Sequence, residues 1–282
     1  MVKELNKKLI SAYLSVEASE RLAGFDVVES TASTNDEVLK SQLMKKGRFI
    51  VCLANHQTAG RGRNGNVWQS PSNAHIYMSI GTVFDVSLVS DIAGLSLASG
   101  VSVVRLLKSL GIKAGLKWPN DVLVADRKLA GILVETRIKS SHVAVVVGLG
   151  LNIEMPESAA LDIEQPWIDL NTIMHKTDFR VFGDLLDENK VNRNYIAAKL
   201  IEELTSSMAL YGVSGFDAFS DDWQKFDVLT GRDVIVKTNH EELDANVIGF
   251  NEDHSVIVRV QGQQKTYYAA DIKLKLNAHV NS

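Results

Sequence analysis

The sequence has little of what marks several common classes of protein. A single cysteine, Cys52, stands among 282 residues, which excludes an internal disulfide and a paired-cysteine zinc site. The seven histidines show no H-x-x-x-H spacing and no pairing with cysteine, so they give no support for a transition-metal site. We therefore expect a protein of a reducing compartment, with Cys52 as a core residue of a strand.

The sequence also lacks an excess of basic residues and long apolar runs. Lys and Arg number 30 against 34 Asp and Glu, a formal net charge of −4, whereas a general nucleic-acid binder usually carries excess positive charge. No stretch reaches the roughly 18 continuous apolar residues of a membrane span. The N-terminus is laced with Lys and Glu and lacks the apolar core of a secretory signal. These features predict a cytoplasmic protein that binds neither DNA nor membranes.

What is present is the composition of a globular protein, with 45% apolar and 23% charged residues. The length suits one large domain and a small one, and no internal repeat is visible. We expect three parts. They are a short N-terminal extension over residues 1–24, a mixed α/β domain over residues 25–228, and a small β-domain over residues 229–282.

Local patterns place the elements within these parts. Thr34 and Glu37 fit a capping box, so a helix should run from about Asn35 to Met44. Short alternating apolar segments between Thr230 and Leu276 predict a small β-barrel or sandwich. Apolar runs and periodicity predict strands over residues 25–28, 49–54, 75–84, 116–118, 122–124, 129–136 and 143–152, and helices over residues 91–110, 194–211 and 216–226.

The most unusual segment is the loop Gln57-Thr58-Ala59-Gly60-Arg61-Gly62-Arg63-Asn64-Gly65-Asn66-Val67-Trp68. Glycines let a backbone approach a ligand closely. Arginines supply planar forks of donors that match a carboxylate or a phosphate. A solvated turn is the plain alternative, but Arg61 and Arg63 among three glycines between two buried strands favour an anion-binding loop.

Gly60, Gly62 and Gly65 also match the G-x-G-x-x-G spacing of a dinucleotide-binding unit, with Asp85 beyond them. That unit needs a helix to begin at the glycines. Here turn formers and Pro71 follow, and then a strand begins, so we reject this interpretation.

Two further cationic elements and one glycine element follow along the chain. Lys117 stands in Lys117-Trp118-Pro119-Asn120-Asp121, and Lys128 opens Lys128-Leu129-Ala130-Gly131. Gly148-Leu149-Gly150-Leu151-Asn152 ends a strand. Each is a weak signal by itself, because a solvated lysine or a strand terminus would look the same.

Together and in this order, these motifs resemble the biotin protein ligases. The resemblance rests on Ser33-Thr34-Asn35, the Gly-Arg loop with Trp68, the segment at Lys117, the run from Lys128 to Glu135, and Gly148 to Asn152. It covers roughly residues 25–276. It implies an α/β (α+β) fold, in which a mixed-sheet catalytic domain of the biotin/lipoate ligase type carries a small C-terminal SH3-like β-barrel.

The resemblance also implies the reaction, the partners and the site. Biotin and ATP, with Mg²⁺ on the nucleotide, would give biotinyl-5′-AMP and pyrophosphate. The adenylate would then biotinylate a lysine of a biotin carboxyl carrier protein, as in acetyl-CoA carboxylase. Arg63, Lys117 and Lys128 would be catalytic. Biotin would contact Ser33, Thr34, Asn35, Gln57, Gly60, Arg61, Gly62, Arg63, Lys117, Gly148 and Gly150, and the nucleotide would contact Arg61, Arg63, Lys117, Lys128, Asn152 and Trp167.

Two departures from the family pattern are visible, and two alternatives stay open. Asn66 stands where the family often has arginine, and Asn64 is also uncharged, so the loop has fewer cations. Only some 24 residues precede Phe25, so the N-terminal DNA-binding domain of bifunctional members is not expected. The alternatives are a lipoate ligase or octanoyl transferase of similar fold and a non-catalytic biotin-sensing regulator. Relatives can dimerise through sheet edges, which leaves a homodimer open.

Overall fold

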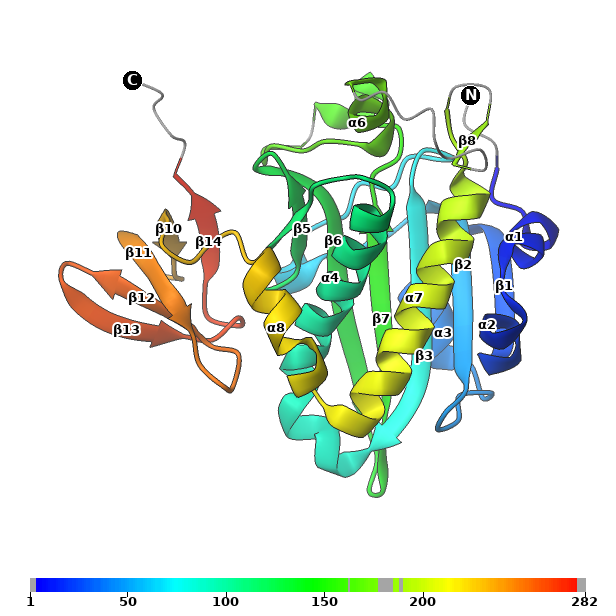
Figure 1. The fold of residues 1–282 in the computed structure, drawn as a ribbon, viewed down its shortest axis with the longest axis horizontal. Helices are drawn as coiled ribbons and strands as arrows, with labels where there is room; N and C mark the ends of the chain where they lie inside the picture. The colour runs from blue at the N-terminus through cyan, green and yellow to red at the C-terminus, as the bar shows by residue number, and fades with distance from the viewer. Residues whose placement is uncertain (1–3, 162, 177–184, 188–189, 278–282) are drawn as a thin grey trace.

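A computed structural model describes residues 4–161, 163–176, 185–187 and 190–277. Two β-sheets organise these residues (Figure 1). The larger sheet has seven strands in the order β1-β2-β3-β7-β6-β5-β4, and the smaller has five in the order β13-β12-β11-β10-β14. A two-stranded ribbon joins β8, Leu186–Asp187, to β9, Lys190–Val191.

The large sheet is mixed. Strands β1 and β2 are parallel, and every other neighbouring pair in this sheet is antiparallel. Strand β2 is covered on both faces, and its first seven residues are all buried. The strands are β1 Leu22–Thr31, β2 Phe49–Gln57, β3 Ile76–Asp85, β4 Gly115–Lys117, β5 Asp121–Val124, β6 Arg127–Ile138 and β7 His142–Leu151.

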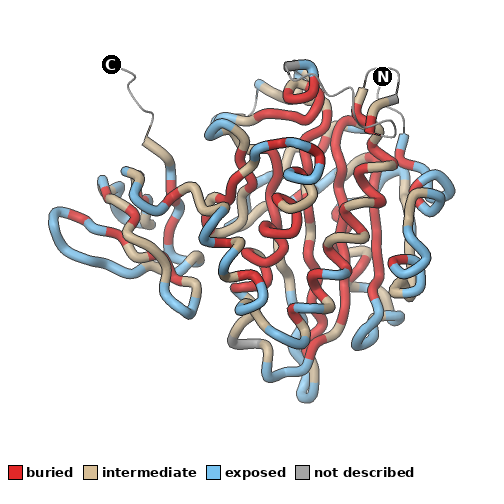
Figure 2. Tube along the Cα trace, in the orientation of Figure 1, coloured by how far each residue is buried: buried red, intermediate tan, exposed pale blue. Residues whose placement is uncertain are grey.

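Helices cover both faces of this sheet. Long helices α4 and α7 pack against each other on one face, and the short helix α3 contacts β2, β3 and β7 on the opposite face (Figure 1). The buried strands and the inner sides of α4 and α7 form one core (Figure 2). The helices are α1 Lys7–Tyr13, α2 Val16–Arg21, α3 Thr34–Lys40, α4 Ile92–Ser109, α5 Glu157–Ala160, α6 Leu170–Lys176, α7 Arg193–Ser214 and α8 Asp217–Phe226, with 3₁₀ turns at Arg63–Gly65 and Val86–Asp91.

Helix α4 has the length and mean hydropathy, 1.3, of a membrane-spanning helix. In the structure 61% of this helix is buried inside the protein. It contacts α7, α8 and strands β4 to β6. Its apolar composition therefore fits a core helix, a class that satisfies the same length and hydropathy test.

The capping-box prediction at the start of α3 is wrong. The N-cap residue is Ser33, whose side chain makes no capping hydrogen bond, and the helix ends at Lys40 rather than Met44. Glu37 accepts a hydrogen bond from the Thr31 hydroxyl instead, and the Thr34 hydroxyl donates to Gln57 at 3.1 Å. Tertiary partners on β1 and β2 thus replace the local cap that the spacing suggested.

Two short helices near the N-terminus, α1 and α2, pack onto the large domain. Ile10 of α1 is fully buried, and α1 contacts α7. The backbone amide of Leu5 donates to the Asn55 side chain at 3.0 Å, which ties this segment to the end of β2.

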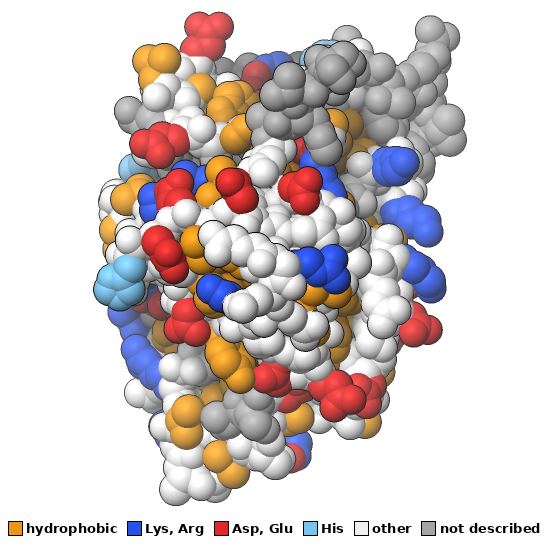
Figure 3. All heavy atoms as spheres, turned by 90° about the vertical axis from the view of Figure 1, so that its left-hand side faces the viewer, with side chains coloured by type: hydrophobic (Ala, Val, Ile, Leu, Met, Phe, Trp, Pro, Cys, Tyr) orange, Lys and Arg blue, Asp and Glu red, His pale blue; other side chains and the backbone are white. Residues whose placement is uncertain are grey.

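The C-terminal part confirms the predicted change to short strands, and the structure pairs five of them in one antiparallel sheet. An aromatic contact joins it to the large domain, with the ring centroids of Trp118 and Phe250 6.4 Å apart. The Trp118 indole also donates to the carbonyl of His254 at 2.9 Å. The strands are β10 Asp233–Lys237, β11 Glu242–Phe250, β12 Val256–Val260, β13 Gln263–Tyr267 and β14 Lys273–Leu276. Basic and acidic side chains are interspersed on the face that carries this sheet (Figure 3).

Candidate functional site

A cavity of about 740 Å³ lies between the α3 side of the large sheet, the loop after β2, and β14 of the small sheet. This volume is within the usual range for a small-molecule site. The cavity is lined by thirteen of the predicted site residues, namely Ser33, Thr34, Asn35, Gln57, Arg61, Gly62, Arg63, Lys117, Lys128, Gly148, Gly150, Asn152 and Trp167. Gly60 lines a second cavity of about 610 Å³, which shares Gln57, Arg61 and Trp68 with the first.

One end of the main cavity is a buried polar cluster. Thr34 and Asn35, at the start of α3, are each 3% exposed. The Gln57 side-chain oxygen accepts from the Thr34 amide at 2.9 Å, and the Ser79 hydroxyl lies 2.6 Å from Thr34 Oγ1 and 2.5 Å from Asn35 Oδ1. These mutual hydrogen bonds offset the cost of burying polar groups and fix their orientation.

Glycines of β6 and β7 make room for side chains above the sheet. A Cβ on Gly148 would lie 2.4 Å from Asn35 Oδ1, and one on Gly150 would lie 2.3 Å from the Trp68 indole. Gly131 pairs with Gly150 across the strands, and a Cβ there would lie 2.9 Å from the same indole. The glycines predicted to let a ligand approach thus also leave room for the side chains of Asn35 and Trp68.

The Gly-Arg loop closes on itself like a hairpin. The Trp68 amide donates to the Gly60 carbonyl at 3.0 Å, and the Gly62 amide donates to the Asn66 carbonyl at 2.7 Å. Asn64 has a left-handed backbone with φ of 54°. No α-helix begins at these glycines, since only the single 3₁₀ turn Arg63–Gly65 follows Gly62, and this agrees with rejection of the dinucleotide-binding interpretation.

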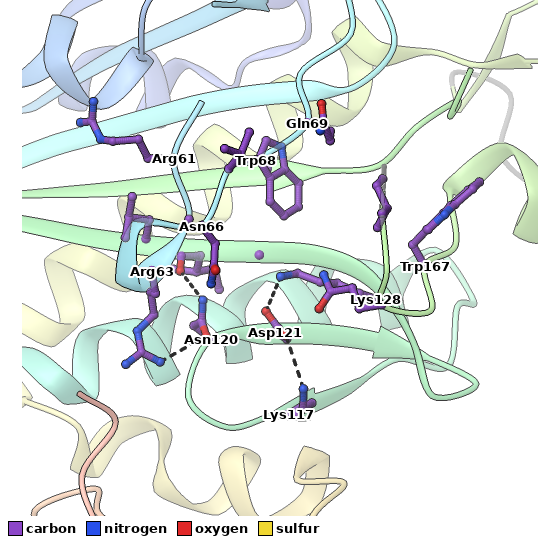
Figure 4. Close-up of a pocket in the computed structure, with 18 of the residues that line it drawn as sticks. Arg61, Arg63, Asn66, Trp68, Gln69, Lys117, Asn120, Asp121, Lys128 and Trp167 are labelled. Atoms are coloured by element: carbon purple, nitrogen blue, oxygen red, sulfur yellow. Dashed lines mark hydrogen bonds and ion pairs between the residues drawn. The ribbon is translucent and has the colours of Figure 1, made fainter. Parts of the chain in front are cut away.

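Two lysines share one carboxylate on the cavity wall. Lys128 Nζ lies 2.7 Å from Asp121 Oδ1, and Lys117 Nζ lies 3.8 Å from Asp121 Oδ2 (Figure 4). All three side chains are less than a fifth exposed. Burial lowers the pKa of Lys117 from its usual value, and the charge of Asp121 opposes that shift. This lysine cluster, made of Lys117, Lys128 and Asp121, carries net positive charge and can hold an anion.

Arg63 lies between the two domains. Its guanidinium donates to the carbonyl of Ala269, in the connection before β14, and approaches Asn120 Oδ1 at 3.5 Å (Figure 4). Burial lowers its pKa from the usual value, while the charge of Asp121 raises it. Arg63 is thus on the same side of the loop as the lysine cluster.

Arg61 points elsewhere, although it was predicted beside Arg63 as a contact for both ligands. Its guanidinium donates to both oxygens of Asp36, at 2.7 and 2.9 Å, and lies 3.3 Å from both oxygens of Glu135. The side chain extends away from Lys117 and Lys128 (Figure 4). Its backbone remains in the loop that lines the cavity.

Asn152 and Trp167 also line the cavity. The Asn152 amide donates to the carbonyls of Lys128 and Ile168, at 3.2 and 3.1 Å. The Lys128 amide in turn donates to the carbonyl of Pro166 at 2.9 Å. Asn152 therefore fastens the segment that carries Trp167 to the start of β6, and Trp167 lines the cavity (Figure 4).

Several site residues were not singled out by the sequence. Asp121 and Trp68 stand inside recognised motifs, but Asp121 pairs with Lys117 and Lys128 through the arrangement of neighbouring strands, and Trp68 packs over Gly131 and Gly150, which are distant in sequence. Ser79, fully buried on β3, carries no local signal. Lys273 of β14 lines the cavity and donates to Asn66 Oδ1 at 3.1 Å, although 207 positions separate these residues. Among the residues that the structure describes, no group of three or more His, Cys, Asp or Glu could hold a metal ion.

Comparison with known proteins adds three findings. Residues 24–152 match the model of the biotin/lipoate A/B protein ligase family. The bifunctional ligase/repressor BirA of Salmonella typhimurium is 34% identical over 259 residues, which cover 91% of this chain and 75% of that protein. The biotin–[acetyl-CoA-carboxylase] ligase of Mycobacterium tuberculosis is 38% identical over 186 residues, which cover 64% of this chain and 62% of that protein.

Among solved structures, the biotin protein ligase from Aquifex aeolicus in complex with biotin and ATP is similar, with a TM-score of 0.70. The match covers 90% of this chain and 99% of that one, at 21% sequence identity. At this identity the likeness establishes the fold, including the arrangement of a mixed-sheet domain and a smaller β-sheet.

Proposed function

The chain belongs to the biotin protein ligases of the biotin/lipoate A/B protein ligase family, and we propose that it activates biotin with ATP and transfers it to a carrier lysine. One observation carries the assignment to this cavity. A buried polar cluster at Thr34 and Asn35 shares one cavity with a net-positive cluster of Arg63, Lys117, Lys128 and Asp121. Biotin has a polar ring at one end and a carboxylate at the other, which suits this polarity.

The first step joins two anions. A carboxylate oxygen of biotin attacks the α-phosphorus of ATP, which enters as its magnesium complex. An oxygen–phosphorus bond forms, the bond to the β-phosphate breaks, and pyrophosphate leaves. Arg63, Lys117 and Lys128 offset the repulsion between the reactants and stabilise charge that develops in the transition state. Asp121 holds both lysines at 2.7 and 3.8 Å, which limits their movement before ligands bind.

The product of the first step is biotinyl-5′-AMP, a mixed anhydride, and the second step consumes it. The ε-amine of a carrier lysine attacks the acyl carbon of biotinyl-5′-AMP, an amide bond forms, AMP leaves, and the amine loses its proton to solvent. We propose a biotin carboxyl carrier protein of an acetyl-CoA carboxylase as the acceptor, by analogy with the names of the relatives. The same analogy supports a cytoplasmic location, where ATP and the carrier would be available.

The remaining residues have binding and shielding roles in this proposal. Ser33, Thr34, Asn35 and Gln57 bind the polar ring of biotin, and the backbone at Gly60, Gly62, Gly148 and Gly150 borders it. Asn152 and Trp167 border the nucleotide. Because an acyl adenylate hydrolyses in water, the loop at residues 60–68 and the segment at Trp167 protect the intermediate by excluding solvent.

Biotin-dependent exchange of pyrophosphate into ATP tests this function directly. We expect exchange with magnesium, ATP and biotin together, and none when lipoate or octanoate replaces biotin. Exchange with lipoate would move the chain to the lipoate ligases, and saturable biotin binding without exchange would indicate a sensor. Transfer of labelled biotin to an isolated carrier domain, and not to a carrier whose lysine is replaced by arginine, tests the second step.

A further inference from the structure

The two arginines of the Gly-Arg loop face different partners. Arg63 donates to Ala269 and Asn120 near the lysine cluster, whereas Arg61 makes a two-pronged contact with Asp36 on α3. Such fork-to-carboxylate pairing fixes the geometry of both groups, because two parallel hydrogen bonds restrict rotation. The loop is thereby fastened to a helix that precedes it by about 25 positions.

A second carboxylate extends this contact into the polar cluster. One Arg61 nitrogen lies 3.3 Å from both oxygens of Glu135 on β6, and Glu135 Oε2 accepts from the Asn35 amide at 2.6 Å. Asn35 is 3% exposed and sits directly over Gly148. A continuous chain of hydrogen bonds thus runs from the loop, through Glu135, to a side chain of the polar cluster.

On the basis of the function proposed above, we propose that Arg61 is a positioning residue rather than a ligand contact. Its side chain holds the loop against α3 and β6, so that Arg63 stays near the lysine cluster and Asn35 stays in place for the polar ring. The assignment divides the two arginines between two tasks. Arg63 contacts the anionic groups of the ligands. Arg61 holds the loop in a fixed position relative to the biotin end of the cavity.

The geometry also predicts that lysine will not substitute for Arg61. A lysine would retain the charge, but a single ammonium cannot reach two carboxylates with the planar fork that Arg61 uses. The Arg61 side chain is 38% exposed, so the pair contributes little to overall stability. Loss of the fork should therefore change the loop and ligand binding more than it changes the folding equilibrium.

Two substitutions separate positioning from direct contact. Arg61→Gln removes the fork, and Asp36→Asn removes its main partner while leaving the arginine and its charge intact. For a positioning role, each should raise the KM for biotin in the exchange assay about tenfold, the effect expected for a charged hydrogen bond. The double variant should be no worse than the more affected single variant, and Arg61→Lys should fail to restore the KM.

Direct contact predicts a different pattern. Asp36→Asn would then leave the KM for biotin unchanged or lower it, and Arg61→Lys would recover most of the binding. Either result would overturn the proposal. Lys40→Gln is the matched control, because it breaks an exposed 3.4 Å ion pair with Glu37 on the same helix and should alter nothing.

Hydrogen exchange provides a readout that does not depend on catalysis. The backbone amides of residues 60–67 should exchange faster in Arg61→Gln and in Asp36→Asn than in the wild type or in Lys40→Gln. Unchanged exchange in both variants would refute the positioning role. Failure of the wild type to exchange pyrophosphate would instead refute the proposed function, so the two failures are distinguishable.

Discussion

The indole of Trp68 occupies the space that a side chain at Gly150 would fill. A Cβ on Gly150 would stand 2.3, 2.4 and 2.6 Å from three atoms of this indole. Gly131, the cross-strand partner of Gly150, leaves the adjoining space, and Lys128 Nζ lies 5.2 Å from the indole centroid. The glycines of β6 and β7 therefore determine where the loop after β2 ends and where its tryptophan meets the cavity.

Gly150→Ala should consequently displace Trp68. We expect a loss of about 1–3 kcal/mol in the free energy of unfolding, the usual cost of overpacking. The KM for biotin should rise as well, because Trp68 lines the cavity. Urea unfolding and the exchange assay measure these two effects. Gly249→Ala is the control, since a Cβ at Gly249 meets no atom within 4 Å, and equal behaviour of the two variants would contradict this role of Gly150.

Arg63→Gly should release the intermediate. The substitution removes the guanidinium that bridges the loop to Ala269 and Asn120. A charged hydrogen bond contributes about 1.5–3 kcal/mol, so retention of biotinyl-5′-AMP should weaken about ten- to one-hundred-fold. Free adenylate in solution and biotinylation of serum albumin are the measurements. Arg63→Lys should release less, and a folded, active Arg63→Gly that releases no more than the wild type would show that Arg63 does not retain the adenylate.

Lys273 should contribute to nucleotide binding from the small β-domain. It lines the cavity and donates to Asn66, an uncharged position of the loop. Because the side chain is exposed, its loss should raise the KM for MgATP only about three- to tenfold. Steady-state exchange at saturating biotin measures this change in Lys273→Ala. Lys265→Ala, an exposed lysine on β13 of the same domain, should match the wild type, and a similar KM for both variants would remove Lys273 from the site.

His75 should make the protein less stable in mild acid. The side chain is fully buried, its Nδ1 accepts from the Ile153 amide at 3.1 Å, and its Nε2 has no hydrogen-bond partner among the described residues. Burial lowers the pKa of His75 to about 4, whereas an unfolded histidine titrates near 6.5. Between these values the unfolded state binds more protons, so stability is present above pH 6.5 and is lost as pH falls toward 4.

From this difference we expect a loss of about 2 kcal/mol in the free energy of unfolding between pH 7 and pH 5. Urea unfolding at both pH values measures it. His75→Gln should remove most of this dependence, and His240→Gln, at an exposed position, should retain it. A flat profile in the wild type, or an unchanged profile in His75→Gln, would contradict the assignment.

Local sequence patterns predict much of the fold. The apolar run at Phe49–Ala54 becomes the buried core of β2, and the periodic segment that stops before Gly111 becomes α4. Both predictions hold because a strand covered on both faces needs a continuous apolar run, and a helix buried on one side needs a regular apolar repeat. Glycine and arginine in one short loop also indicated an anion-binding element, whereas the roles of the individual site residues came from the resemblance to the biotin protein ligases.

The tertiary structure decided the partners of those residues. Whether Arg61 meets a ligand or a carboxylate depends on Asp36 and Glu135, which are 25 and 74 positions away, and the short-range capping pattern at Thr34 yielded to Gln57 on β2. Lys273 beside Asn66, 207 positions away, likewise follows from contact between the small sheet and the loop. Long polar side chains take the direction of their strongest available partner, and which partner is available is set by packing between segments that are distant in sequence.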